Sequence, residues 1–327
     1  MPIEFPKDKF PGSVRTVTLG ALPADGGSRT STVTVGGEKS MAFLHFEGPA
    51  ACSPAIAVEI KDQRPTDWSA VLLSAWGSAA DNPVSWAKAA EALGAKLLVL
   101  DLSLTGPDGK PKTPAHAVQT VKSVLGAVGL PLIVYGPGQA DLDNELLVAI
   151  AEATKGERLS LGLCEDKNYR TIVATAMANG HTVWARSPMD VNLAKQLNIL
   201  ISDMGLSISS ILMDPSTAAV GYGIEYGYSV IERLRLAALQ GDQMTQAPII
   251  VTPGFEAWKT KEAKVGGAEA AVPAAWGDWT NRAIAWETLT AVTLLEAGAD
   301  ILVMRHPESI RRVQQTIDNL MKVPTLA

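Results

Sequence analysis

The chain has 327 residues, of which 47% are hydrophobic and 19% charged, and its formal net charge is −6. This composition supplies a large buried core and excludes global disorder. A negative net charge argues against nucleic-acid binding, which usually requires a basic surface to neutralise phosphates. No apolar run is long enough to span a membrane, and the N-terminal MPIEFPKDKFPG lacks the apolar stretch of a signal peptide. We therefore expect a cytoplasmic protein with no membrane contact and no nucleic-acid partner.

The two cysteines, Cys52 and Cys164, lie far apart in the sequence. We expect both to be reduced thiols, as is usual in the cytoplasm. A cubane iron–sulfur cluster normally takes four cysteines, and structural zinc takes four Cys or His ligands at close spacing. The sequence therefore predicts neither an iron–sulfur cluster nor another metal site on this chain.

Residues 1–54 differ in pattern from the rest of the chain. The segments SVRTVTL and STVTVGG alternate apolar with polar or β-branched residues, and Asp25-Gly26-Gly27 lies in the turn region between them. This pattern is typical of a β-hairpin. We expect an N-terminal hairpin extension, 1–54, that packs on a domain formed by residues 55–327.

Eight short apolar runs follow, and helical patterns separate them. They are continuously apolar rather than alternating, as expected for parallel strands buried on both faces. No G-x-G-x-x-G follows the first run, which disfavours an open nucleotide-binding sheet. Eight runs in a chain of this length predict an α/β fold, a (β/α)8 or TIM barrel. The runs are 55–60, 96–102, 131–136, 159–164, 181–187, 210–216, 248–254 and 300–306.

In such a barrel the functional residues lie at the carboxyl ends of the strands, which form its mouth. Every run here ends in polar residues, although some of them are expected only to cap helices or to bond the backbone. The strand-end residues that we expect to contact a cofactor are Asp62, Asp101, Asn168, Asp214, Thr217, Gly254, Arg305 and His306. The other strand-end residues are Glu59, Ser103, Tyr135, Glu165, Arg186, Ser187 and Thr252.

Three features of the mouth allow more than one interpretation. For His306, a hydrogen-bonding role is favoured over a metal-binding one, because the cobalamin motif D-x-H-x-x-G is absent. The segment GYGIEYG, 221–227, either turns into a helix or offers backbone N–H groups to an anion. Lys61 is the only lysine placed to form a Schiff base, and no feature of the sequence indicates that it is activated.

Several long segments carry a resemblance to a known family. They are KFPGSVRTVTLG, WGSAADNPVSWAKAAEALGAKLLVLDLSLTGPDG, ILMDPSTAAVGYGIEYGYSVIERLRLAALQGD, APIIVTPGFEAWKTKE and WGDWTNRAIAWETLTAVTLLEAGADILVMRHPESI. They resemble the delta subunit of acetyl-CoA decarbonylase/synthase, the family of the small subunit of the bacterial corrinoid iron–sulfur protein. The resemblance extends over essentially the whole chain.

The resemblance implies a heterodimer with a larger corrinoid/iron–sulfur subunit, which would carry the [4Fe–4S] cluster. A cobamide, the cobalt corrinoid, would lie between that subunit and the mouth of this barrel. Methyl groups would pass from methyltetrahydrofolate, through a separate methyltransferase, to cobalt and then to acetyl-CoA synthase, in the reductive acetyl-CoA pathway of anaerobes. The chain would then be a methyl-carrier subunit that covers the reactive corrin face, with no catalytic residue of its own.

Two loops are expected to form the cobamide and partner surface. The first, 214–227, is rich in small residues such as Gly221 that let backbone approach a large flat ring, and it carries Tyr222. Its Asp214 and Thr217 would bond the amide side chains of the corrin.

The second loop, 252–267, is long for a barrel loop. We expect it to expose Phe255 and Trp258 beside Lys259, as anchors for the partner. The alternative is that Trp258 packs on other tryptophans of the chain.

Two enzyme functions remain as alternatives. A pterin-dependent methyltransferase acting on a corrinoid protein would use Asp62, Asp101, Asn168 and Asp214 to hold the pterin. A lyase or aldolase barrel is disfavoured by the positions of the lysines. Methyl transfer by the chain alone, or borohydride trapping of a Schiff base, would distinguish them.

Overall fold

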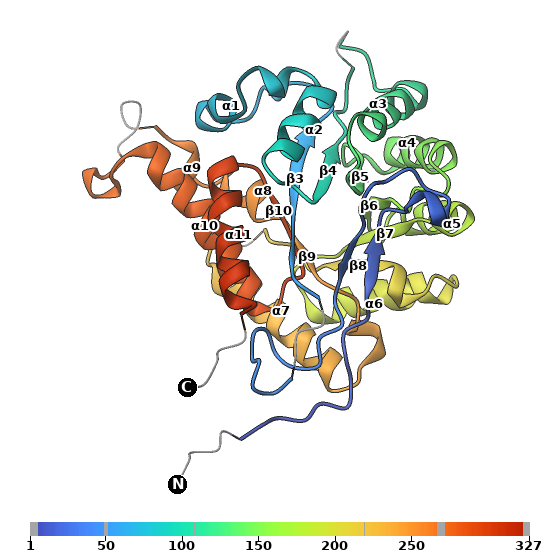
Figure 1. Cartoon of the computed structure of the whole chain (residues 1–327), viewed down its shortest axis with the longest axis vertical. Helices are drawn as coiled ribbons and strands as arrows, with labels where there is room; N and C mark the ends of the chain where they lie inside the picture. Colours follow the sequence, from blue (N-terminus) through green and yellow to red (C-terminus); the bar gives the residue numbers. More distant parts are fainter. Residues whose placement is uncertain (1–5, 49–51, 107–108, 219, 267–271, 323–327) are drawn as a thin grey trace.

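The computed structural model describes residues 6–48, 52–106, 109–218, 220–266 and 272–322. Figure 1 shows a group of strands at the centre of the molecule, with helices arranged around it. Eight of the strands form one parallel sheet, and the first two form a separate antiparallel pair. The predicted (β/α)8 barrel with an N-terminal hairpin is confirmed.

The barrel strands follow one another in chain order around the sheet. They are β3 (Ala55–Lys61), β4 (Leu97–Asp101), β5 (Leu132–Tyr135), β6 (Ser160–Cys164), β7 (Thr182–Arg186), β8 (Ile211–Asp214), β9 (Ile250–Val251) and β10 (Ile301–Met304). β10 pairs in parallel with β3, and a parallel bridge between Met213 and Ile249 joins β8 to the start of β9. The N–H of Met213 also donates to the carbonyl of Pro248 at 2.8 Å, so the sheet closes on itself.

The helices begin and end where the local sequence carries capping residues. The Asp278 side chain accepts from the N–H of Asn281 at the start of α10, and Gly180 and Gly298 end α5 and α10 in the left-handed conformation. The helices are α1 (Ala70–Trp76), α2 (Pro83–Ala92), α3 (Pro114–Ala127), α4 (Ala140–Ala153), α5 (Tyr169–Asn179), α6 (Val191–Asp203), α7 (Ile224–Leu239), α8 (Pro253–Ala257), α9 (Lys261–Lys264), α10 (Trp279–Ala297) and α11 (Pro307–Leu320).

The segment 252–267 differs from the long loop expected from the sequence. It forms α8 and α9 in succession, and its last residue, Gly267, lies outside the described residues. Backbone groups in this segment therefore bond one another, and its side chains take fixed directions.

Alternation of side chains along the strands separates two apolar cores. Ala57 of β3 and Val99 of β4 pack together inside the barrel, whereas Ile56 and Val58 belong to the core between the barrel and its helices. The direction in which a strand residue points therefore depends on its parity along the strand.

The N-terminal hairpin closes the amino-terminal end of the barrel. Its strands are β1 (Val17–Leu19) and β2 (Val33–Val35), and the apolar side chains at both ends of each strand belong to the core inside the barrel. Arg29, in the connection between them, is buried and donates to the carbonyls of Leu125 and Val128 at 2.7 and 2.8 Å. The carboxyl-terminal end is therefore the end at which a site is available.

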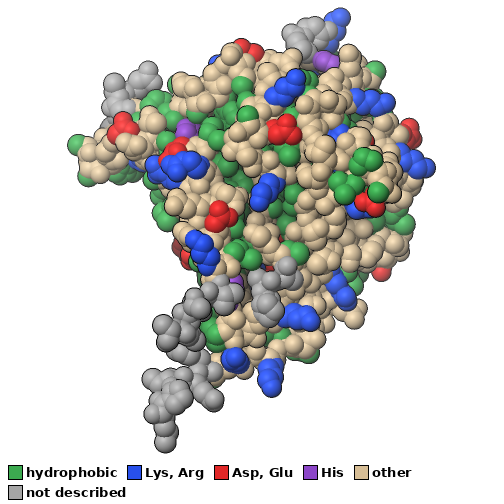
Figure 2. Space-filling view, viewed as in Figure 1, with side chains coloured by type: hydrophobic (Ala, Val, Ile, Leu, Met, Phe, Trp, Pro, Cys, Tyr) green, Lys and Arg blue, Asp and Glu red, His purple; other side chains and the backbone are tan. Residues whose placement is uncertain are grey.

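The surface carries charges of both signs. On the face shown in Figure 2, Lys and Arg side chains are scattered among acidic and apolar ones. Among the helices that the structure describes, none combines the length and the hydropathy needed to cross a membrane.

Candidate functional site at the barrel mouth

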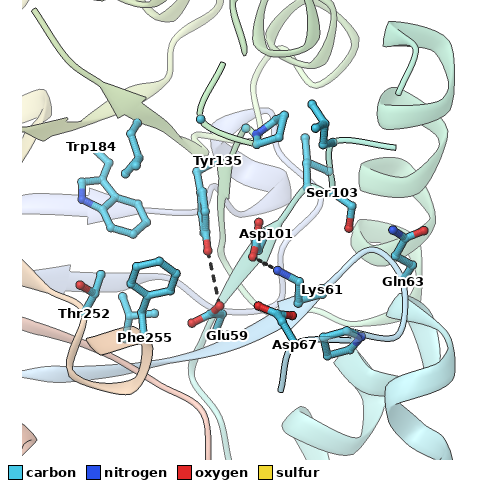
Figure 3. Close-up of a pocket in the computed structure, with 18 of the residues that line it drawn as sticks. Glu59, Lys61, Gln63, Asp67, Asp101, Ser103, Tyr135, Trp184, Thr252 and Phe255 are labelled. Atoms are coloured by element: carbon cyan, nitrogen blue, oxygen red, sulfur yellow. Dashed lines mark hydrogen bonds and ion pairs between the residues drawn. The ribbon is translucent and has the colours of Figure 1, made fainter. Parts of the chain in front are cut away.

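A cavity of about 430 Å³ opens where the strands end (Figure 3). Three aromatic side chains line it: Tyr135 at the end of β5, Trp184 in β7 and Phe255 in α8. The rings of Tyr135 and Trp184 meet edge to face, with centroids 5.4 Å apart. The cavity is within the size range of small-molecule sites.

Most charged groups around the cavity are paired with one another. Arg305 donates to both carboxylate oxygens of Glu59, at 2.8 and 2.6 Å, and Lys61 forms an ion pair with Asp101. The Tyr135 hydroxyl donates to Glu59 at 3.4 Å, as drawn in Figure 3. The cavity floor is therefore polar but largely neutralised.

Arg305 is also held between two aromatic rings. Its guanidinium carbon lies 4.7 Å from the ring centroid of Trp68 and 5.0 Å from that of Phe255. Lys259 lies over the same Phe255 ring, with its Nζ 3.4 Å from the centroid. These cation–π contacts fix Phe255 as one wall of the cavity.

Burial changes the proton affinity of two groups in the cavity. It raises the pKa of Asp101 from 3.8 to about 6, although the neighbouring Lys61 opposes the change. Burial, with the nearby carboxylates of Asp101 and Glu59, also raises the pKa of Tyr135 well above its usual value. Tyr135 therefore stays a neutral hydroxyl that donates hydrogen bonds.

Two of the predicted cofactor contacts, Asp62 and Asn168, lie outside the cavity. Asp62 accepts from the Ser103 hydroxyl and forms a buried ion pair with Lys112, both at 2.5 Å. Asn168 accepts from the N–H of Glu165 at 2.8 Å and donates to the Leu163 carbonyl at 3.0 Å. Both side chains hold loops together, and neither presents a free group at the mouth.

Asp214 and Thr217 are likewise engaged within the protein. Asp214 is fully buried and accepts from the Trp184 indole at 2.9 Å and from the N–H of Ser216 at 2.8 Å. The Thr217 hydroxyl accepts from the N–H of Thr252 at 3.1 Å. Protein groups thus already bond both side chains, and their contact with a cofactor stays a prediction.

His306 serves as the N-cap of α11. Its Nδ1 accepts from the N–H of Glu308 at 3.1 Å, and its ring stacks on Trp258 with centroids 5.9 Å apart. Burial lowers its pKa from 6.5 to about 4, so the ring is neutral at pH 7. This is the hydrogen-bonding role favoured from the sequence.

Gly254 and Trp258 both take part in the packing of α8 against neighbouring elements. A Cβ atom at Gly254 would lie 2.9 Å from the backbone nitrogen of Arg305, so this glycine allows α8 to pack against β10. Trp258 is only 5% exposed, and its indole donates to Glu287 of α10 at 3.0 Å. The expected exposure of Trp258 is wrong, because α8 turns its ring toward α10; its stacking partner is His306 rather than another tryptophan.

The remaining candidates lie at the cavity or its rim. Asp101 and Phe255 line the cavity, and Arg305 contacts the lining residues Glu59 and Phe255. Tyr222 is 91% exposed, and the Lys259 side chain is half exposed. A Cβ atom at Gly221 would meet nothing within 4 Å. Contact of these residues with a cofactor or a partner stays a prediction.

The sequence placed Arg186 at the mouth and offered Lys61 as a Schiff-base lysine, but neither was predicted as a cofactor contact, and Trp184 was not predicted at the site; all three line the cavity. A signal existed in the two-residue repeat of the strands: Lys61 has the parity of the inward-facing Ala57, and Arg186 has the parity of Trp184. Asp62 has the opposite parity to Lys61, and His306 has the opposite parity to Val303, and neither Asp62 nor His306 lines the cavity.

The described residues include no group of three or more His, Cys, Asp or Glu side chains that could hold a metal ion. Cys164 is fully buried and Cys52 is partly exposed, and both are free thiols. The cavity residues thus suit binding by aromatic contact and hydrogen bonding.

Comparison with solved structures places the barrel among known folds. Dihydropteroate synthase from Xanthomonas albilineans superposes with a TM-score of 0.58 and 12% identity, covering 83% of this chain and 95% of that one. The enzyme from Thermus thermophilus superposes with a TM-score of 0.53 and 13% identity, covering 94% and 100%. At this identity the likeness shows a shared fold alone.

Comparison of sequences is more specific. The acetyl-CoA decarbonylase/synthase complex subunit delta of Archaeoglobus fulgidus is 37% identical over 317 residues, covering 96% of this chain and 70% of the relative. The subunit of the same name from Methanopyrus kandleri is 35% identical over 309 residues, covering 94% and 75%. The family described as CO dehydrogenase/acetyl-CoA synthase delta subunit matches residues 16–318. This chain therefore belongs to the CO dehydrogenase/acetyl-CoA synthase delta subunit family.

Proposed function

We propose that the chain is a methyl-carrier subunit of an acetyl-CoA decarbonylase/synthase complex in the cytoplasm. Its barrel mouth would cover a cobamide held with a larger corrinoid/iron–sulfur subunit. Methyl groups would arrive from methyltetrahydrofolate through a separate methyltransferase and leave to acetyl-CoA synthase. The observation that carries the proposal is an aromatic cavity with paired charges at the open end of a barrel of this family.

The rim of the cavity, rather than the cavity itself, would hold the corrin. A cavity of about 430 Å³ suits a small molecule, so a corrin with its amide side chains would lie across the rim. Apolar side chains are exposed there, with Tyr222 91% and Leu104 43% exposed, and Gly221 leaves open space beside Tyr222. A flat, largely apolar ring would bury these groups.

The chain itself would supply cover and exclude water. The cobamide, when bound, supplies the cobalt that carries the methyl group. Below it, Tyr135 and Phe255 would present apolar ring surface, and the pairs Glu59–Arg305 and Lys61–Asp101 would keep charge neutralised. Exclusion of water protects a reactive centre from side reactions.

A pterin-dependent methyltransferase is the second candidate. It is favoured by the fold shared with dihydropteroate synthases, one of which was solved with pteroic acid, and by Asp101, which lines the cavity. It is weakened by the other three residues proposed to hold a pterin, Asp62, Asn168 and Asp214, because protein groups already bond them. Methyl transfer from methyltetrahydrofolate to added cobamide, by this chain alone, would establish it.

The proposed carrier role is tested at the rim. The chain is co-produced anaerobically with the larger corrinoid/iron–sulfur subunit, and heterodimer yield and bound cobalt are measured. Gly221→Trp adds bulk where the chain has open space, so we expect the fold to persist while heterodimer and cobalt are lost.

The matched control is Leu289→Ser, which changes a 59% exposed side chain in the middle of α10. It is expected to assemble and hold cobalt like the parent. Normal cobalt content in Gly221→Trp would place the cobamide elsewhere, and absence of cobalt from the parent heterodimer would refute the proposal.

A further inference from the structure

Arg186 differs from the other cations that line the mouth cavity. Lys61 is paired with Asp101, and Arg64 is paired with Asp81 and donates to the Gly77 carbonyl. The nearest acidic oxygen to Arg186 is Oδ2 of Asp214, 3.9 Å from its Nε, which is beyond hydrogen-bond distance. Within the described part of the chain, its terminal guanidinium nitrogens have no hydrogen-bond partner.

Asp214 does not neutralise Arg186 by direct bonding. Its two carboxylate oxygens accept from the Trp184 indole and the N–H of Ser216, at 2.9 and 2.8 Å. The Arg186 side chain is 22% exposed and comes from the last residue of β7, two positions after Trp184. Since side chains two apart share a face of the sheet, Arg186 and Trp184 point to the same side, and both line the cavity.

A second unpartnered group lines the same cavity. Thr252 is 5% exposed, and its hydroxyl has no hydrogen-bond partner among the described residues. A buried polar group without a partner costs free energy unless a ligand or water satisfies it. Arg186 and Thr252 thus leave unused hydrogen-bonding capacity in a cavity walled by aromatic rings.

We infer that the cavity is a binding site for a small planar aromatic carboxylate. The two terminal nitrogens of Arg186 form a fork that matches the two oxygens of a carboxylate, which is the geometry guanidinium groups bind best. Tyr135, Trp184 and Phe255 supply ring surface for the planar part of the ligand (Figure 3). The cavity volume, about 430 Å³, accommodates such a molecule.

This site requires neither the cobamide nor a partner. The proposed cobamide would lie across the rim, whereas Arg186 and Thr252 lie at the strand ends below it. Binding can therefore be measured on the full chain alone, and its outcome is separate from the outcome for heterodimer and cobalt.

The test is isothermal titration calorimetry of the full chain with 2-naphthoate and with 2-naphthamide, which has the same shape but no charge. The parent is expected to bind 2-naphthoate at least about tenfold more tightly than 2-naphthamide. Arg186→Gln should weaken 2-naphthoate binding by about tenfold or more and leave 2-naphthamide unchanged. Thr252→Val should weaken 2-naphthoate binding by a few fold, on the order of one hydrogen bond.

Arg64→Gln is the matched control, because Arg64 lines the same cavity but its guanidinium is paired with Asp81. It should bind 2-naphthoate like the parent, and thermal unfolding should show that every variant is folded. Equal binding of the two ligands by the parent, or unchanged 2-naphthoate binding by Arg186→Gln, would overturn the inference. So would absence of any binding heat at about 1 mM ligand.

Discussion

Replacement of Arg305 by methionine tests how the paired charges support the mouth. The side chains of Arg305 and Glu59 are only 6% and 1% exposed, and the two hydrogen bonds between them measure 2.8 and 2.6 Å. Arg305→Met leaves the Glu59 carboxylate buried, and among the described residues its remaining hydrogen-bond donor is the Tyr135 hydroxyl, 3.4 Å away. Removal of one partner from a buried ion pair costs about 3–5 kcal/mol in free energy of unfolding.

The same pair provides a control for this magnitude. Glu59→Leu combined with Arg305→Met removes both charges, and replacement of a whole buried pair by apolar side chains is often near neutral. The double variant should therefore be more stable than Arg305→Met alone, with a coupling energy of about 2 kcal/mol or more.

The assay is urea unfolding followed by far-ultraviolet circular dichroism, for the parent, both single variants and the double variant. A cost below about 1 kcal/mol for Arg305→Met would refute the reasoning. So would a double variant whose loss equals the sum of the two single losses, because the pair would then not be coupled.

Three further predictions concern Asp101, His306 and two glycines. Burial raises the pKa of Asp101 from 3.8 to about 6. Between about pH 4 and 6 the folded state therefore binds more protons than the unfolded state. The contribution of Asp101 to the free energy of unfolding falls as pH rises through that window. Asp101→Asn should remove that part of the pH dependence, measured from urea midpoints; an unchanged profile would contradict it. Because the pKa of His306 is lowered to about 4, its capping contribution should be complete above about pH 6.5 and be lost as pH falls toward 4. At neutral pH, His306→Ala should cost about 1 kcal/mol and His306→Asn less, and equal urea midpoints for parent and His306→Ala would argue against a capping role. Gly254→Ala should destabilise the fold by about 1–3 kcal/mol, because its Cβ would lie 2.9 Å from the backbone nitrogen of Arg305. Gly221→Ala should be near neutral, because a Cβ there would meet open space. Thermal unfolding of the two variants compares their stability.

Local patterns in the sequence were sufficient for the strands, the hairpin and several helix ends. Continuous apolar runs mark parallel strands because both faces of each strand are buried, and Asp278 and Gly298 mark α10 because caps satisfy the backbone groups nearest to them. Family membership also followed from the sequence, because the resemblance extends along nearly the whole chain.

The same apolar runs do not show the direction of each side chain. When both faces of a strand are apolar, the sequence does not show which of the two alternating sets of side chains points into the barrel. The structure shows that Ala57, and with it Glu59 and Lys61, points inward, so Asp62 points away from the cavity. The predicted set of contacts therefore mixed residues of both parities.

The position of Trp258 was also decided only by tertiary structure. Its indole bonds Glu287, which is 29 residues away in the sequence, and its ring stacks on His306. A polar rim pattern around an aromatic residue predicts exposure, but a buried carboxylate on α10 requires a donor, and Trp258 supplies it. Contacts between residues so distant in sequence depend on how the closed barrel brings α8, α10 and β10 together, and local sequence carries no record of that arrangement.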